Sequence, residues 1–182
     1  MKLEWRRMTE TDLEMVMCWR MRPDITRFMN TDPQLTVDGQ RAWFEGIRKR
    51  EDVRYWIIYV DGESAGVINI ANIDIANRRC EWGYYVAEKR VRSLQLAVAL
   101  EYNLYEHVFN VIHMNRLSYE VLAFNKQVIK LHELCGSKIE GIMRQHVYKN
   151  GQYHDVVLFG MLAEDWHELQ STVHFEKATI EE

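Results

Sequence analysis

The sequence of 182 residues contains little cysteine, proline or glycine, and each shortage excludes a class of protein. The three cysteines, Cys18, Cys80 and Cys135, lie far apart and form no CxxC pair or Cys/His ligand spacing, so we expect neither a disulfide framework nor a bound metal. Nine glycines and two prolines argue against long linkers and low-complexity tracts. Reduced thiols are typical of the cytoplasm, and we expect a cytoplasmic protein.

Long apolar runs and an excess of positive charge are also missing. No segment is long and apolar enough to cross a bilayer, and the N-terminal stretch MKLEWRRMTETDLEM has no apolar signal core. The formal net charge is -4, which gives no general attraction to nucleic acid or to an anionic membrane. We therefore expect no nucleic-acid partner and no membrane partner.

Apolar and aromatic residues, in contrast, are plentiful, at 47% and 12% of the chain. A chain of this length and composition can bury one sizeable core. We expect one domain over residues 1–165, followed by a charged C-terminal tail, residues 166–182, that is helical in part.

The hydrophobic pattern alternates between the period of a strand and that of a helix. Strands are predicted at residues 2–8, 53–60, 64–73, 78–86, 116–122, 137–149 and 153–162. Helices are predicted at residues 9–22, 36–50, about 91–109 and 125–136. The pair Asn150-Gly151 lies between the last two strands and is a strong signal for a hairpin.

The order of these elements predicts the sheet. Three consecutive hairpin-linked strands indicate antiparallel pairing, whereas the strand–helix–strand segment around residues 80–121 indicates a parallel pair with a right-handed crossover. We expect an α/β (α+β) fold with a single mixed, mostly antiparallel sheet, a central parallel pair and flanking helices. Ligands tend to bind where the pairing changes direction, beyond the carboxyl ends of the strands.

The stretch EKRVRSLQLAVALEYNLYEHVF, residues 88–109, begins with a basic cluster and continues as a helix. The first turn of a helix has unpaired N–H groups and a positive dipole end, so a pyrophosphate would be well held there. Arg90 and Arg92 would add charge. The alternative is that Lys89, Arg90 and Arg92 form a solvated basic turn.

Over nearly its whole length the sequence resembles the GNAT superfamily of acetyl-CoA-dependent N-acetyltransferases. The motif Gln/Arg-x-x-Gly-x-Gly/Ala of that superfamily corresponds to RSLQLA, where Arg92 and Ala97 fit and Gln95 replaces a glycine. The run from Phe109 to Val147 is similar to the helix–strand–helix–strand segment of the superfamily, with Gly136-Ser137 at its usual Gly-Phe stop.

This resemblance implies the GNAT fold and acetyl-CoA as cosubstrate. If the first helical turn is ordinary, a side chain at Gln95 does not harm the pyrophosphate site, because its backbone N–H still points at the ligand. The resemblance implies the following cofactor-binding residues: Val86, Ala87, Arg92, Ser93, Leu94, Gln95, Leu96, Ala97 and Asn125.

A narrower resemblance concerns the acceptor. CWRMRPDITRFM, EWGYYV, VIKLHELCG and GQYHDVVLFGMLAEDW are similar to acetyltransferases that act on UDP-4-amino sugars in pseudaminic acid biosynthesis. The implied reaction is acetylation of a UDP-linked 4-amino-4,6-dideoxy sugar by direct attack on the thioester. Acetylation of a protein N-terminus or a polyamine, and a non-catalytic GNAT-fold binding module, stay open as alternatives. The oligomeric state also stays open, with a homodimer as one option.

His132 is the candidate acid. It lies where many enzymes of the superfamily place a tyrosine that protonates the CoA thiolate, and imidazole can do this near neutral pH. The alternative is a surface histidine on an amphipathic helix, since KLHEL is half polar. Tyr84 or Tyr85 is a rival acid, with Tyr85 as a candidate catalytic residue; the alternative is that one of the two is a core aromatic.

Glu81 is the candidate base, acting through water, if a crevice raises its pKa. The alternative is an exposed glutamate paired with Arg78 or Arg79. Strand alternation places Glu81 on the face of Tyr85, opposite to Tyr84. The resemblance also implies that a backbone N–H near Val86 or Ala87 faces the thioester oxygen.

The substrate wall is expected in the segment WRMRPDITRFM. Arg20 or Arg22 can bind a diphosphate as a fork, and Trp19 can stack on a uracil or sugar ring. Tyr84 is included as a further substrate contact. The alternatives are a core position for Trp19 and solvated arginines.

Overall fold

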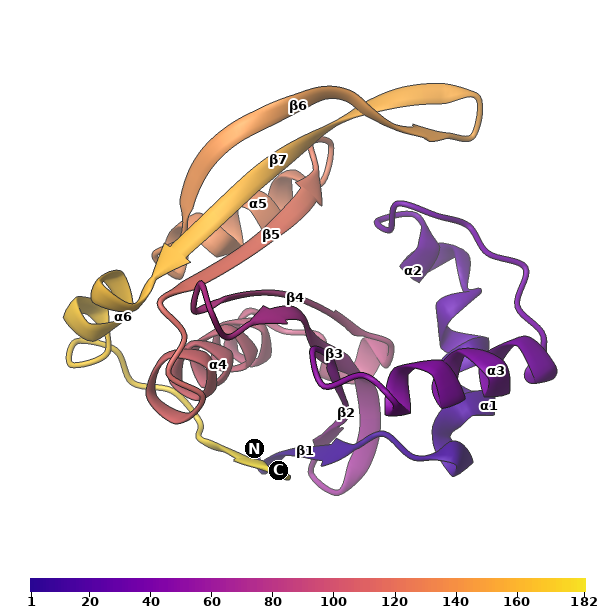
Figure 1. Cartoon of the computed structure of the whole chain (residues 1–182), viewed down its shortest axis with the longest axis horizontal. Helices are drawn as coiled ribbons and strands as arrows, with labels where there is room; N and C mark the ends of the chain where they lie inside the picture. The colour runs from indigo at the N-terminus through magenta and orange to yellow at the C-terminus, as the bar shows by residue number, and fades with distance from the viewer.

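Eight strands form one mixed sheet in the computed structural model, which describes all 182 residues (Figure 1). Their spatial order is β6-β7-β5-β4-β3-β2-β1-β8. β4 pairs with β5 and β1 with β8 in parallel, and all other pairs are antiparallel. The predicted fold class is confirmed. The strands are β1 (Leu3–Arg7), β2 (Arg54–Val60), β3 (Glu63–Asp74), β4 (Arg79–Val86), β5 (Arg116–Leu122), β6 (Lys138–Lys149), β7 (Gln152–Leu162) and β8 (Ala178–Ile180).

Local sequence signals mark where several of the helices begin. Thr9 forms a capping box with Asp12, Thr36 accepts a hydrogen bond from the N–H of Gly39, and Pro23 occupies the first turn of a short helix. The α-helices are α1 (Leu13–Arg20), α2 (Pro23–Thr26), α3 (Val37–Arg48), α4 (Leu94–Tyr105), α5 (Lys126–Leu134) and α6 (Ala163–Leu169). Two 3-10 turns, η1 (Glu10–Asp12) and η2 (Lys89–Val91), precede α1 and α4.

The helix predicted at residues 91–109 differs from the structure at both ends. It begins at Leu94, because Ser93 is extended and its hydroxyl accepts a hydrogen bond from the N–H of Leu96. Its last part is a π-helix, η3 (Glu106–Val111). The basic cluster therefore lies in the turn before the helix rather than in its first turn.

The two faces of the sheet carry different cores. α4, α5 and α6 cover one face around buried side chains such as Trp56, Leu100 and Trp166. α1 and α3 cover the other face, where Leu13, Val16, Trp19 and Phe44 pack on Ile57 and Val67. Side chains of β4 alternate between these two cores, as strand geometry requires.

The segment after residue 165 packs on the same sheet. Trp166 is fully buried, and β8 pairs with β1. Trp56 Nε1 donates to Glu181 O at 2.7 Å, which fixes the last residues beside β1, and the two termini lie close together (Figure 1). The domain boundary at residue 165 stays a prediction from sequence.

Gly66 allows β3 to lie closely against the end of β4. It pairs with Val86, and a Cβ atom added to Gly66 would lie 2.1 Å from Tyr85 O. We expect Gly66→Ala to lower the free energy of unfolding by about 1–3 kcal/mol, because the backbone of β4 would have to move. Urea unfolding measures this.

Gly46→Ala on α3 is the matched control. A Cβ atom there meets nothing within 4 Å, and alanine in a helix should raise the free energy of unfolding by about 0.5–1 kcal/mol. Equal urea midpoints for wild type and Gly66→Ala would contradict the close approach of β3 and β4.

Candidate active site

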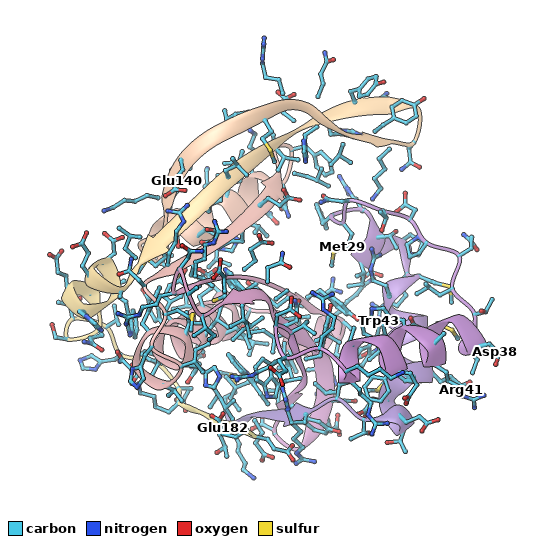
Figure 2. All side chains as sticks on the ribbon, in the orientation of Figure 1. Met29, Asp38, Arg41, Trp43, Glu140 and Glu182 are labelled. Carbon is cyan, nitrogen blue, oxygen red and sulfur yellow. The ribbon has the colours of Figure 1, made fainter.

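A cavity of about 960 Å³ opens where β4 and β5 separate. The two strands pair only through Arg79, Cys80 and Glu81 with Arg116, Leu117 and Ser118, and then diverge (Figure 1). Met29, after α2, and Trp43, on α3, line its other side (Figure 2). Of the site residues predicted from sequence, those that line the cavity are Arg20, Tyr84, Tyr85, Val86, Arg92, Ser93, Leu94, Leu96, Ala97, Asn125 and His132.

The open edge of β4 carries free backbone N–H groups. Arg116 N–H donates to Arg78 O, and Arg92 Nε donates to Val86 O at 2.8 Å, so even-numbered residues here direct their backbone groups away from β3. Because these groups alternate along a strand, the N–H groups of Tyr84 and Val86 point into the space left by β5.

Ala87, in contrast, cannot supply the predicted N–H. It is fully buried, and its N–H already donates to Ala65 O at 2.7 Å. Of the two residues, only Val86 directs its N–H towards the open edge of β4.

The N-terminus of α4 offers further donors. The N–H groups of Ser93, Leu94 and Gln95 make no hydrogen bond within the protein, whereas that of Leu96 is taken by the Ser93 hydroxyl. Gln95 has no positive φ, its side chain is exposed, and it lies outside the cavity lining. Because the Gln95 side chain lies outside the cavity, an anion can approach the N–H groups at this end of the helix. Because the backbone at position 95 is not in the left-handed region, glycine is not needed there.

The arginines of the preceding turn bind the protein itself. Arg92 Nη2 donates to Asp24 Oδ2 at 2.8 Å and to Ala87 O at 2.9 Å, and Arg90 forms an ion pair with Glu63. From the sequence alone, Lys89, Arg90 and Arg92 could bind a phosphate or face solvent. In the structure Arg90 and Arg92 instead bind groups of the protein. Arg92 connects the end of β4 to α2.

Arg22 and Trp19 do not reach the cavity, which corrects two predicted substrate contacts. Arg22 donates to both carboxylate oxygens of Asp24, at 2.9 and 3.0 Å, and to Ala87 O. Trp19 is 7% exposed and belongs to the core under α1, where its Nε1 donates to Glu88. Both side chains stabilise the segment that leads into α2.

Glu81, the predicted base, also does not lie at the cavity. It lies in the part of β4 that still pairs with β5, is exposed, and accepts a hydrogen bond from Asn72 Nδ2 at 2.9 Å. It does not line the cavity, so the catalytic role predicted for it does not fit the structure.

Tyr84 and Tyr85 lie on opposite faces of β4. Tyr84 stacks on Trp82 with 5.3 Å between ring centroids, and burial raises its pKa well above the ordinary value, so it is a weaker acid than a free tyrosine. Tyr85 packs with the core under α1 and α3, and its hydroxyl is buried without a partner. Burial raises the pKa of Tyr85 as well, against the opposing charge of Arg20.

His132 is buried in the wall of the cavity, at 3% exposure, and is not a surface histidine. Its Nδ1 lies 2.9 Å from Oε1 of Glu101 on α4. Sequence reasoning missed Glu101, although a glutamate inside the apolar run LQLAVALEYNLY was a usable signal. Asn125, just before α5, lines the cavity and its side chain makes no hydrogen bond to cap α5.

A buried lysine from the last hairpin holds α2 beside the cavity. Lys149 is 7% exposed, donates to Met29 O at 2.7 Å and to Thr26 O, and lies 2.9 Å from Asp32. The tip of the β6–β7 hairpin thus reaches the segment after α2 (Figure 1). Neither Lys149 nor Asp32 was predicted from the sequence.

A sheet that opens after a short parallel contact, with free N–H groups on one strand and a helix N-terminus beside it, can hold an extended, phosphate-bearing thioester. This arrangement defines an acyltransferase of the CoA-dependent class. No group of three or more His, Cys, Asp or Glu side chains is arranged to hold a metal ion. No helix combines the length and apolar character needed to cross a membrane.

Residues 2–138 match the Acetyltransferase (GNAT) domain family, and the chain belongs to this family. It is an N-acetyltransferase with acetyl-CoA as cosubstrate.

The proteins to which this chain is similar have names that point to different acceptors. The chain is 30% identical over 106 residues to the putative ribosomal N-acetyltransferase YdaF of Bacillus subtilis, a match over 58% of this chain and 57% of that protein. It is 24% identical to the acetyltransferase PseH of Campylobacter jejuni, over 67% of this chain and 74% of that protein. The fold matches spermidine N-acetyltransferase from Vibrio cholerae in complex with CoA and spermine, with a TM-score of 0.85, 17% identity, and coverage of 91% and 98%.

Asp24 provides a test of the arginine cluster. Hydrogen bonds from Arg22 and Arg92 hold the pKa of Asp24 well below its usual range. The contribution of ionised Asp24 to the free energy of unfolding is therefore fully present above the unfolded-state pKa of about 3.9, and it is lost as the pH falls below that value. We expect Asp24→Asn to lower the free energy of unfolding by roughly 1 kcal/mol between pH 5 and pH 8, and by less below about pH 4.

Asp38→Asn is the control for this urea series. Asp38 on α3 has 96% of its side chain exposed, 3.7 Å from Arg41, and both point to solvent (Figure 2). We expect its effect to stay within about 0.5 kcal/mol at every pH. A loss for Asp24→Asn that does not shrink in acid would show that the ion pairs are not its source.

Proposed function

We propose that this acetyltransferase acetylates the amino group of a UDP-linked 4-amino-4,6-dideoxy sugar, by direct attack of the amine on the thioester of acetyl-CoA. The observation that carries the proposal is the guanidinium of Arg20, which lines the cavity and has one nitrogen buried without a partner. The residue segments that resemble the UDP-amino-sugar enzymes and the likeness to PseH also support it.

Arg20 lies at the end of α1 and lines the cavity. Nη2 donates to the carbonyl and the hydroxyl of Thr31, at 3.2 and 3.0 Å, while Nη1 has no acceptor. The buried hydroxyl of Tyr85 on the same side also lacks a partner. Buried donors of this kind need acceptors, and phosphate oxygens provide them with the geometry that a guanidinium prefers.

The chemistry of the proposal uses both faces of β4. In the proposed reaction the Val86 N–H donates to the thioester oxygen as negative charge develops there. As the C–S bond breaks, His132 gives a proton to the sulfur, and burial of Tyr84 makes that tyrosine the weaker acid. Both chemical roles are proposals about this chain's own residues.

The base assigned to Glu81 needs a replacement, and Glu120 on β5 is the best placed carboxylate. It lines the cavity and accepts a hydrogen bond from Asn30 Nδ2 at 2.6 Å, rather than from a lysine or arginine. The other cavity carboxylate, Asp24, is held by Arg22 and Arg92. We propose that Glu120 takes the proton of the acceptor ammonium, through water.

A polyamine is the second candidate acceptor, because Glu120 is also suited to bind a cation. The spermidine N-acetyltransferase fold gives this candidate some support. The two candidates differ in the charge that binds the acceptor: a UDP sugar would be bound by Arg20, and a polyamine by Glu120. A peptide N-terminus would need neither charge in particular.

UDP inhibition separates the acceptors. UDP should compete with the amine and not with acetyl-CoA. Arg20→Met should raise the KM of the UDP-amino sugar roughly 10- to 150-fold, because a charged hydrogen bond to phosphate contributes about 1.5–3 kcal/mol. Arg20→Lys should recover part of this loss, and the KM of acetyl-CoA should change little in both variants. Steady-state kinetics with both substrates varied give these values.

Arg27→Met is the control, since Arg27 is exposed on the same segment and does not line the cavity. Efficient acetylation of spermidine without inhibition by UDP would transfer the assignment to the polyamine. Absence of a melting shift with millimolar acetyl-CoA would instead favour a non-catalytic binding module.

His132→Phe tests the acid. Turnover should fall by roughly two to four orders of magnitude, while calorimetry shows acetyl-CoA binding as in wild type. A wild-type rate across the pH range would exclude His132 as the acid, and Tyr84 or water would then protonate the thiolate.

A further inference from the structure

Glu101 is a carboxylate that the core encloses completely. It lies in the middle of α4 with 0% of its surface exposed, among the side chains of the larger core. No lysine or arginine forms an ion pair with it, and the one basic group in contact is His132. A buried carboxylate without a partner is costly, so the placement of Glu101 calls for an explanation.

Its two oxygens have different partners. Oε2 accepts a hydrogen bond from the Tyr105 hydroxyl at 2.8 Å, and that hydroxyl also lies 2.9 Å from Ser137 Oγ. Oε1 lies 2.9 Å from Nδ1 of His132, a close contact whose angle is not that of a hydrogen bond, and neither atom has another partner. Tyr105 and Ser137 are neutral, so they orient the carboxylate without balancing its charge.

The ring of His132 is fixed by three aromatic side chains. Its centroid lies 4.5 Å from that of Tyr119, 5.2 Å from Phe159 and 5.9 Å from Trp82. Because Nδ1 contacts Glu101 and the residue lines the cavity, Nε2 is the nitrogen available to a bound substrate.

Other titratable groups around the pair stay uncharged near neutral pH. Burial raises the pKa of Tyr84 and Tyr105 well above the ordinary value for tyrosine, and it also raises the pKa of Tyr119 and of the Cys135 thiol. Burial likewise raises the pKa of Tyr102, and His132 is the one side chain in contact with Glu101 that can carry a positive charge.

We propose that Glu101 is a positioning residue for acetyl transfer: its carboxylate holds Nδ1–H of His132 and stabilises the imidazolium, so that Nε2–H faces the thioester sulfur. This rests on the proposed role of His132 as the acid. By the time His132 acts, the amine nitrogen has bonded to the thioester carbon and has lost its extra proton to water. The C=O bond re-forms as the C–S bond breaks, the electron pair of that bond stays on sulfur, the Nε2–H bond breaks and an S–H bond forms. His132 is left as the neutral Nδ1–H tautomer, still held by Glu101, and it regains its Nε2 proton from solvent.

Glu101→Gln tests the charge while keeping the size of the side chain. We expect kcat to fall roughly 10- to 100-fold with little change in the KM of acetyl-CoA, as is usual when the partner that orients a functional histidine is lost. The alkaline limb of the kcat profile should move to lower pH, since the imidazolium loses its counter-charge. The amine for this assay is whichever of the UDP-amino sugar and spermidine the wild type acetylates.

Two variants separate positioning from a structural role. Tyr105→Phe removes the hydrogen bond from the Tyr105 hydroxyl to Glu101 and keeps the charge of Glu101, so the alkaline limb should stay in place. In a His132→Phe background, Glu101→Gln should cause no further loss of kcat. An equal fold-loss in both backgrounds would overturn the proposal.

A second readout does not need turnover. In ¹⁵N-histidine NMR spectra the His132 signals, assigned by their loss in His132→Phe, should titrate at lower pH in Glu101→Gln than in wild type. Identical titration in the two proteins would show that Glu101 has a structural role only. If no amine is acetylated, the proposed function fails, whereas the NMR titration still decides whether Glu101 and His132 act as a pair.

Discussion

Three residue pairs hold β4 and β5 together, and the site depends on the fact that the pairing stops there. Beyond Glu81 and Ser118 each strand keeps one partner, β3 for β4 and β7 for β5, and each loses the other. An unpaired strand edge inside a cavity leaves N–H groups that need acceptors. The separation therefore creates a surface for a ligand that carries carbonyl groups along its length, which suits the amide-containing arm of acetyl-CoA.

Several polar contacts connect the elements around the open end of β4 and β5 to α2. Arg92 binds the carbonyl oxygens of Val86 and Ala87 and connects them to Asp24 on α2. Lys149 ties the β6–β7 hairpin to the segment after α2. Both cations bind backbone carbonyl groups of the protein, so in the proposed reaction the anionic groups are bound by the N–H groups at the start of α4 and by Arg20.

The alternation of side chains along β4 divides the proposed work between two faces. Tyr84 lies on the side of His132 and Glu101, and Tyr85 lies on the side of Arg20. In the proposed reaction, proton transfer to sulfur thus takes place on one face and recognition of the acceptor on the other. The cavity joins the two faces because no strand fills the gap after Glu81.

The sequence by itself determined the order and type of the main elements, the hairpin at Asn150-Gly151, the parallel pair and the membership of the family, because periodicity, caps and motif spacing are local properties. It also pointed to His132 and to Arg20. Only the tertiary structure decided that Glu81 is exposed, that Arg22 and Arg92 bind Asp24, that Ala87 lacks a free N–H, and that Glu101 meets His132. Each of these depends on which residue distant in the chain supplies a counter-charge, a hydrogen-bond acceptor or a covering side chain, and the spacing of residues along one chain does not contain that information.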